Sequence, residues 1–249
     1  MCWTCHGGTI HGERLTRRRL CQGMLAAPLA MGPVRKDGLV EPVLRLPPGH
    51  GPRRVAVTLD ACPGHFDPRI AGLLVARNIP ATIFITAVWM RMNPDGLAFF
   101  LKYPTVFTLE NHGARHLPPV LGTQRIYGLE VAGSWPAIEA EIAGGADAVY
   151  KVTGRHPTWY RGAAGLYTPS VVPKIEGLGV RVAGYSLNSD AGASFPAALV
   201  EARIKAARDG DVIEGHINQP RRASGAGIAA GLAALQESGA QFARLDEIA

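Results

Sequence analysis

The sequence has few cysteines, few charged residues and no long hydrophobic run. A membrane-spanning helix needs roughly 18 or more consecutive apolar residues, and no such run occurs in the 249 residues. Only four cysteines are present, which excludes a disulfide-rich scaffold. Charged residues make up 18% and hydrophobic residues 47%, a composition that excludes intrinsic disorder. We therefore expect a folded domain with a large core and no integral membrane span.

The first 32 residues have the pattern of an export signal. Arg17 and Arg18 precede a short, alanine-rich apolar segment at 24–31, as in twin-arginine signal peptides. We predict a twin-arginine-like signal peptide at 1–32, a catalytic domain at 33–249, and a periplasmic or extracellular protein. The alternative is a basic N-terminal arm on a cytoplasmic protein.

Removing this leader leaves little net charge. The whole chain carries +6, and the leader has four arginines against one glutamate, so the remaining 217 residues carry +3. This charge is too small and too dispersed to indicate a nucleic-acid partner. Cys62 is the single cysteine after residue 32, so no disulfide can form within the mature chain.

Apolar runs alternate with helical patterns from residue 53 onward. We predict strands at 53–60, 81–88, 105–111, 158–161, 181–185, 211–216 and 241–245, and helices at 66–78, 94–103, 134–152, 168–177, 196–208 and 225–238. Seven βα-like units predict a single α/β domain with a parallel sheet, and closure into a (β/α)7-type barrel would remove its edges. The long irregular stretch at about 113–133 is a candidate site loop.

Polar residues stand where the predicted strands end. They are Asp60, His112, His116, Arg161, Asp190 and His216. The carboxyl ends of parallel barrel strands meet at one mouth, where active sites are built. We therefore expect these six side chains to lie together.

This set of side chains suits hydrolysis. His112 and His116 are four residues apart and can share one divalent cation, and imidazole ligands favour zinc. A carboxylate can take a proton from water, and a histidine can protonate the leaving group. An arginine can orient the carboxylate, and a second carboxylate can fix the tautomer of the histidine.

Five segments in order resemble the motifs of the polysaccharide deacetylases (NodB homology, carbohydrate esterase family 4). The segment 57–62 resembles T-F-D-D, 111–116 resembles H-[ST]-x-x-H, 160–165 resembles R-x-P-[YF]-G, 189–190 takes the place of the fourth motif, and 210–216 resembles the fifth, which ends in histidine. The similarity runs from about residue 55 to 248. It implies a deformed (β/α) barrel, an acetylated glycan as substrate and a bound divalent metal.

The resemblance also implies a role for each residue. Asp60 would be the general base, and His112 and His116 would be metal ligands. Arg161 would orient Asp60. Asp190 would tune His216, the general acid.

The resemblance is broken where the family has its third metal ligand, because Ala61 replaces the second aspartate of the first motif. Two histidines alone hold zinc weakly. Cys62 would share a strand face with Asp60 and is a candidate replacement, although such a cysteine is more often an inert turn residue. Glu110 and Asp67 are the other nearby acids, and each is more often solvated or helix-capping than a ligand. The third and fourth motifs also lack their aromatic residues, which leaves the substrate open.

We therefore expect a hydrolase that removes acetyl groups, with N-acetyl favoured over O-acetyl, from an amino-sugar glycan. The alternatives are an amidohydrolase that acts on a small non-sugar amide and a catalytically impaired glycan-binding protein. The sequence indicates no organic cofactor, and it leaves the oligomeric state open.

Overall fold

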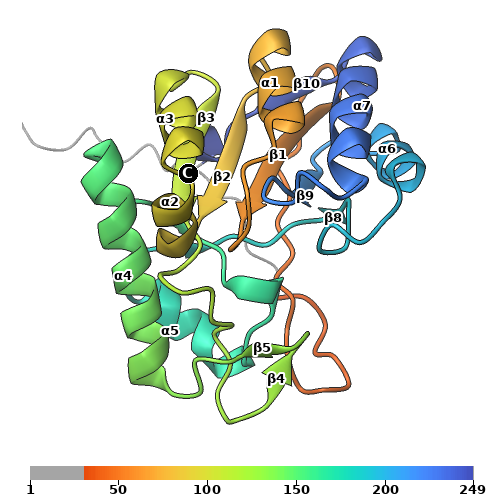
Figure 1. Cartoon of the computed structure of the whole chain (residues 1–249). Helices are drawn as coiled ribbons and strands as arrows, with labels where there is room; N and C mark the ends of the chain where they lie inside the picture. Colours follow the sequence, from red (N-terminus) through yellow and green to blue (C-terminus); the bar gives the residue numbers. More distant parts are fainter. Residues whose placement is uncertain (1–30, 249) are drawn as a thin grey trace, which may run out of the picture.

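The computed structural model describes residues 31–248 as one α/β domain (Figure 1). Its main sheet has eight strands, all paired in parallel, in the order β7-β6-β3-β2-β1-β9-β8, with β10 also paired to β1. The strands are β1 (Arg54–Ala61), β2 (Ala81–Ile85), β3 (Phe107–Asn111), β6 (Trp159–Tyr160), β7 (Arg181–Val182), β8 (Leu187–Asn188), β9 (Val212–His216) and β10 (Gln241–Ala243). The predicted fold class is confirmed.

The sheet curls without closing. Within residues 31–248, no strand pairing joins β7 to β8. The segment before β1 covers this opening, because the carbonyl of Pro42 accepts a hydrogen bond from the amide of Tyr185, and Arg45 forms an antiparallel bridge with Asp211. Leu44 and Leu46 from this segment pack inside the curled sheet with Phe84. The molecule is therefore a half-barrel with a plugged interior.

Alternation along the strands separates two hydrophobic layers. In β1, Val55, Val57 and Leu59 pack toward the helices, whereas Ala56 packs in the barrel interior. Because successive strand side chains point to opposite faces, Thr58 and Asp60 also face the interior. The inner face of the sheet therefore carries polar residues near the carboxyl ends of the strands, at the mouth of the half-barrel.

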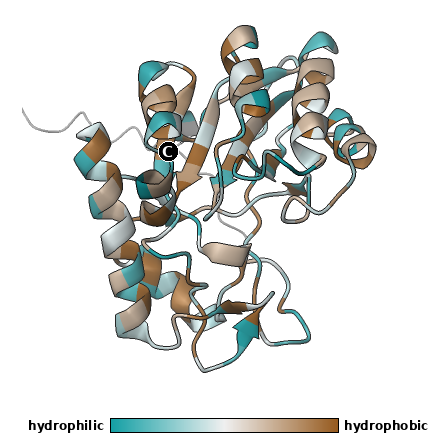
Figure 2. Cartoon of the chain, viewed as in Figure 1, coloured by the Kyte–Doolittle hydropathy of each residue, from teal (hydrophilic) through white to brown (hydrophobic). Residues whose placement is uncertain are grey.

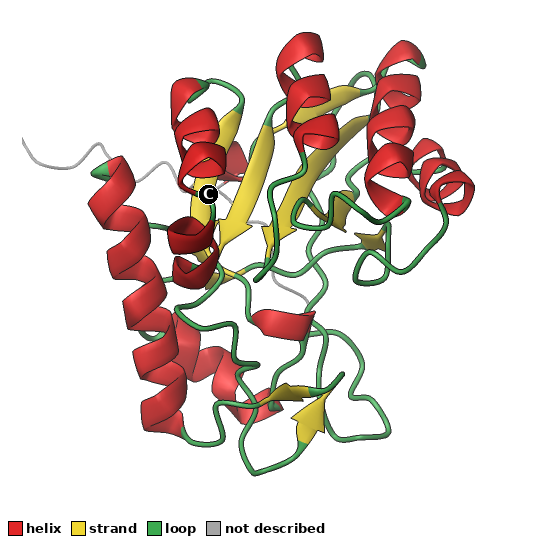
Figure 3. Cartoon of the chain, in the orientation of Figure 1, coloured by secondary structure: helices red, strands yellow, loops and turns green. Residues whose placement is uncertain are grey.

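Helices cover the outer face of the sheet (Figure 3). They are α1 (Pro68–Arg77), α2 (Ala87–Met92), α3 (Pro94–Lys102), α4 (Trp135–Thr153), α5 (Val172–Glu176), α6 (Ala197–Lys205) and α7 (Ser224–Glu237). In Figure 2, α1, α3 and α7 carry hydrophobic and hydrophilic residues side by side, as helices with one buried face do. The side chain of Ser134 accepts a hydrogen bond from Ala137 at the start of α4, which is the start that the sequence predicted.

Three local predictions need correction. The strand predicted at 81–88 ends at Ile85, because the hydroxyl of Thr86 accepts a hydrogen bond from the amide of Trp89 and starts α2. The irregular stretch at 113–133 contains a hairpin, β4 (Arg125–Ile126) and β5 (Leu129–Glu130). The short strand β8 has no counterpart in the sequence prediction.

The predicted signal peptide lies almost entirely outside the described residues. Residues 1–30 and 249 are not described, and the leader stays a prediction. Between residues 31 and 248, no helix is both long enough and apolar enough to cross a membrane.

Candidate active site

The carboxyl ends of the strands meet at one cavity of about 720 Å³. In Figure 1, the arrows of β1 and β2 point toward the part of the molecule that holds α4, α5 and the β4–β5 hairpin. Asp60 at the end of β1 is the direct register partner of His216 at the end of β9. Both side chains line the cavity, together with Cys62, His116 and Glu214. The predicted convergence at the mouth is thus present in the structure.

Asp60 forms a buried ion pair with Arg161. The guanidinium of Arg161 donates to Oδ1 of Asp60 at 2.8 Å and to the hydroxyl of Thr58 at 2.9 Å. Arg161 also donates to the carbonyls of Ala183 and Gly184, and it is fully buried. Burial alone would raise the pKa of Asp60, but the positive charges of Arg161, His112 and His216 together outweigh burial and lower the pKa. Asp60 is therefore ionised, with Oδ2 left to face the cavity.

His216 is held between two carboxylates. Its Nδ1 lies 2.9 Å from Oδ1 of Asp190 and 3.2 Å from Oε1 of Glu214, and its backbone amide donates to Oδ2 of Asp190. Burial disfavours the imidazolium, but Asp190 and Glu214 outweigh burial and raise the pKa of His216 well above its usual value. With Nδ1 engaged, Nε2 is the nitrogen that can exchange a proton in the cavity.

Glu214 is the second carboxyl group beside His216. Burial raises the pKa of Glu214 to about 8; His216 opposes that shift, and the negative charge of Asp190 adds to it. An oxygen of Glu214 and one of Asp60 lie with a ring nitrogen of His216 within 4.8 Å of one another. Sequence analysis gave Glu214 no role, although strand alternation places it on the inner face, two residues before His216.

Cys62, His112 and His116 form a second cluster. The Sγ atom of Cys62 lies 3.3 Å from Nε2 of His112, and one ligand atom from each of the three residues lies within 4.8 Å of the others. The rings of His112 and His116 are 5.0 Å apart. Burial would raise the pKa of the Cys62 thiol, but the two histidines lower it well below its usual value. Soft sulfur and two imidazoles are ligands that zinc prefers, so this cluster fits a divalent metal.

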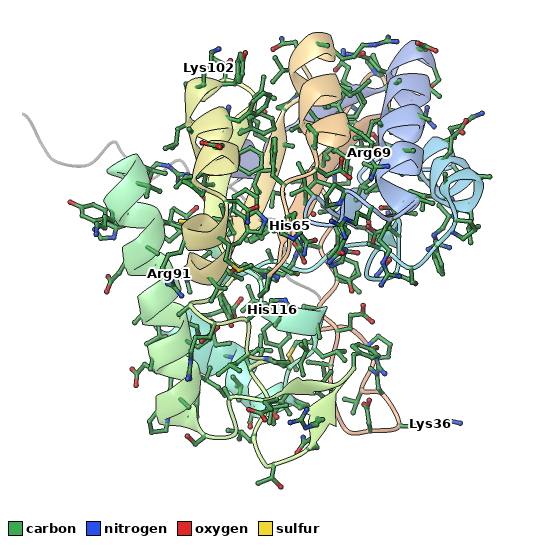
Figure 4. The ribbon with its side chains drawn as sticks, in the orientation of Figure 1. Lys36, His65, Arg69, Arg91, Lys102 and His116 are labelled. Atoms are coloured by element: carbon green, nitrogen blue, oxygen red, sulfur yellow. The ribbon has the colours of Figure 1, made fainter. Side chains whose placement is uncertain are left out.

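The loop that carries His116 is anchored by a buried glutamate of α4. Oε1 of Glu141 accepts hydrogen bonds from the backbone amides of Arg115 and His116, both at 2.7 Å, and of Leu117 at 3.2 Å. His116 itself has a φ of +71°, a left-handed conformation that costs free energy for a residue with a side chain. Glu141 thus holds the backbone in the conformation that turns His116 toward the cavity. In Figure 4, His116 lies between the strand ends and the β4–β5 hairpin.

Ala61, which replaces the family's third ligand, and the two nearby acids all lie away from this cluster. Ala61 packs in the outer hydrophobic layer. The carboxylate of Asp67 caps α1 and pairs with Arg69. Glu110 is buried, pairs with Arg155 and accepts hydrogen bonds from the backbone amides of Thr158 and Trp159. None of the three takes part in the cluster of Cys62 and the two histidines.

The six predicted residues therefore fall into two adjoining groups. Asp60, Arg161, Asp190 and His216 can supply an oriented base and an oriented acid. His112 and His116, together with Cys62, can supply a metal site, and Nε2 of His112 lies 3.8 Å from Oδ2 of Asp60. Sequence analysis did not identify Glu141, whose spacing from His116 gives no local signal.

A family model described as "Polysaccharide deacetylase" matches residues 48–183, more than half of the chain. No curated protein matches the sequence.

Solved structures of similar fold share little sequence with this chain. The Bc1960 peptidoglycan N-acetylglucosamine deacetylase has a TM-score of 0.67 and 16% identity, over 83% of this chain and 91% of that chain. PdaA of Bacillus subtilis, a family 4 carbohydrate esterase, has a TM-score of 0.63 and 17% identity, over 83% of each chain. BA3943 of Bacillus anthracis, a family 4 pseudoenzyme, has a TM-score of 0.63 and 16% identity, over 80% of this chain and 66% of that chain. These likenesses concern the fold.

Proposed function

Because the chain belongs to the polysaccharide deacetylase family, we propose that it hydrolyses the N-acetyl group of an amino-sugar glycan. The observation that carries this proposal is the pair of oriented proton-transfer groups in one cavity. Asp60 is fixed by Arg161 at 2.8 Å, and His216 is fixed by Asp190 at 2.9 Å. A base and an acid that face each other across neighbouring strands are what amide hydrolysis needs.

Asp60 and His216 divide the proton transfers between them. Oδ2 of Asp60 accepts a proton from the water that attacks the acetamide carbonyl, while Arg161 keeps Oδ1 in place. Nε2 of His216 gives a proton to the departing amine, and Asp190 stabilises the imidazolium that donates it. His112, His116 and a third ligand would hold a divalent cation, which when bound would supply Lewis-acid polarisation of the carbonyl.

The rims of the cavity suit a sugar substrate. Tyr127, at the tip of the β4–β5 hairpin, lines the cavity and is 73% exposed. Tyr185 also lines the cavity, where it is half-buried and hydrogen-bonds to Glu41. Exposed aromatic rings stack on the apolar faces of sugars. The named activity of Bc1960, on peptidoglycan N-acetylglucosamine, makes an oligomer of this sugar the first substrate to test.

Two other functions compete with this proposal. One is hydrolysis of a small non-sugar amide, and the other is glycan binding without turnover, which Ala61 and the pseudoenzyme among the similar structures bring into consideration. Asp60→Asn separates them from deacetylation. A deacetylase loses acetate release in this variant and still binds the oligomer in calorimetry. An unchanged oligomer affinity, with no acetate released by either protein, would instead support the binding protein. Release of acid only from small amides would support the amidohydrolase.

We further propose that the protein acts outside the cytoplasm, as the arginine pair at residues 17 and 18 indicates. Residues 1–32 fused to a reporter that is active only after export would carry it out of the cytoplasm. The Arg17→Lys, Arg18→Lys double variant should lose export if the arginine pair directs it. Retention of the wild-type fusion in the cytoplasm would refute the export proposal.

A further inference from the structure

Three donor atoms converge beside the proposed general base. Sγ of Cys62, a nitrogen of His112 and a nitrogen of His116 lie within 4.8 Å of one another, and Sγ and Nε2 of His112 are 3.3 Å apart. The separation of 3.3 Å between Sγ and Nε2 of His112 matches that of two ligands of a tetrahedral zinc, which lie roughly 3.3 to 3.8 Å apart when each is about 2.0 to 2.3 Å from the metal. The third donor atom lies within 4.8 Å of both, near enough to complete the set after a small side-chain adjustment.

The ring of His112 is oriented by a hydrogen bond, and the ring of His116 has a buried nitrogen without a partner in residues 31–248. Nδ1 of His112 lies 2.7 Å from the carbonyl of Arg161, so it carries the proton and Nε2 presents its lone pair to Cys62. Nε2 of His116 is buried and has no hydrogen-bond partner among the described residues. A buried nitrogen without a partner is unfavourable unless something binds it.

Hydrogen bonds from Asn218 and Thr86 also fix the backbone around Cys62. The side-chain amide of Asn218 donates through Nδ2 to the carbonyls of Cys62 and Pro63, at 2.9 and 3.3 Å. The carbonyl of Ala61 accepts from the amide and hydroxyl of Thr86. These contacts hold Cys62 on the cavity face, while the side chain of Ala61 packs in the outer core.

We propose that Cys62 is the third protein ligand of the divalent metal, one residue beyond the position where Ala61 interrupts the family pattern. The site is then a Cys-His-His centre that selects a thiophilic ion, zinc, over the hard cations magnesium and manganese. This inference rests on the proposed function only for the expectation that a metal binds. Its chemistry is read from the convergence of sulfur and two imidazoles.

The opposing interpretation makes Cys62 a nucleophile activated by His112. A cysteine nucleophile needs only one histidine as its base, so this role does not explain why His116 also lies beside Cys62. A Cys62→Asp variant distinguishes the two roles, because aspartate can bind zinc but is a far weaker nucleophile toward an amide than a thiolate.

The test measures metal binding directly in the full chain. Every protein carries Cys2→Ser, Cys5→Ser and Cys21→Ser, so that Cys62 is the only thiol. The reference protein is loaded with cobalt(II), and we expect a near-ultraviolet sulfur-to-cobalt charge-transfer band that is absent from Cys62→Asp and Cys62→Ala. Zinc affinity is measured by chelator competition, and magnesium and manganese are expected to compete poorly with zinc.

Removal of the thiol is expected to weaken zinc binding by more than about 100-fold in Cys62→Ala, since changes in residues that merely support metal ligands already cost 10- to 100-fold. Cys62→Asp should recover part of this loss without the charge-transfer band. Circular dichroism and thermal unfolding in a chelator show whether Cys62→Ala is folded.

Two results separate this inference from the proposed function. If zinc binding depends on Cys62 but the protein releases no acetate, the metal centre is supported and the proposed deacetylase function is contradicted. A cobalt spectrum without a thiolate band and a zinc affinity that is unchanged in folded Cys62→Ala overturn the inference, even if acetate is released.

Discussion

The buried pair of Arg161 and Asp60 gives a prediction for stability. Arg161 has no exposed surface, and the side chain of Asp60 is 8% exposed. Removing one partner of a buried ion pair costs about 3–5 kcal/mol, because the other charge stays buried without compensation. Asp60 retains some contact with the cavity, so we expect Arg161→Leu to lower the free energy of unfolding by about 3 kcal/mol, at the low end of that range.

The double variant Arg161→Leu, Asp60→Leu provides the control. It removes both charges, and a coupling of about 1–3 kcal/mol should make it less destabilised than the sum of the two single variants. Urea unfolding of the unsubstituted protein, the two single variants and the double variant, followed by circular dichroism, gives the coupling free energy of this double-mutant cycle. Additive losses, or a loss below about 1 kcal/mol for Arg161→Leu, would contradict the account of Arg161 as the partner that holds Asp60 ionised.

The remaining predictions concern the groups around His216 and His116. Asp190→Asn removes a cause of the raised pKa of His216, so the alkaline limb of the pH profile of kcat/KM should move to lower pH; an unmoved limb would exclude His216 as the acid. Glu141→Ala deprives three backbone amides of a charged acceptor and should cost about 3 kcal/mol in urea unfolding, with Glu141→Gln costing less; equal small effects would refute the anchoring role. The pKa of Glu214 is raised to about 8 from a usual 4.5, so the folded state holds this proton more tightly, and stability falls as pH rises from about 4.5 to 8. Glu214→Gln should show a shallower fall over this range, and a slope identical to that of the unsubstituted protein would contradict the assignment.

The sequence predicts the parts of the site that follow from strand periodicity. Asp60, His112 and His216 each stand at the end of a strand whose position is plain from its apolar run, and parallel strands bring their carboxyl ends together. Thr86 illustrates where this reasoning fails. The apolar pattern continues past it to Val88, yet the hydroxyl of Thr86 caps a new helix, and a run of apolar residues does not distinguish a strand from the first turn of a helix.

Residues that act through tertiary contacts leave no local signal. Glu141 lies on a helix about 25 residues from the loop that it anchors, so only the fold brings its carboxylate to the amide of His116. The environment of Cys62 is equally non-local. A cysteine after a strand is most often inert, and its nearness to His112 depends on how β1 and β3 flank β2 in the sheet.

Acetate release from N-acetylglucosamine oligomers is the most direct test of the proposed activity. The purified chain would be stripped of metal, assayed, and assayed again after addition of zinc, with Asp60→Asn treated in parallel. The account predicts no release from the stripped protein, release after zinc is restored, and none from Asp60→Asn in either state. Absence of release from the zinc-loaded protein, or equal release from Asp60→Asn, would contradict it.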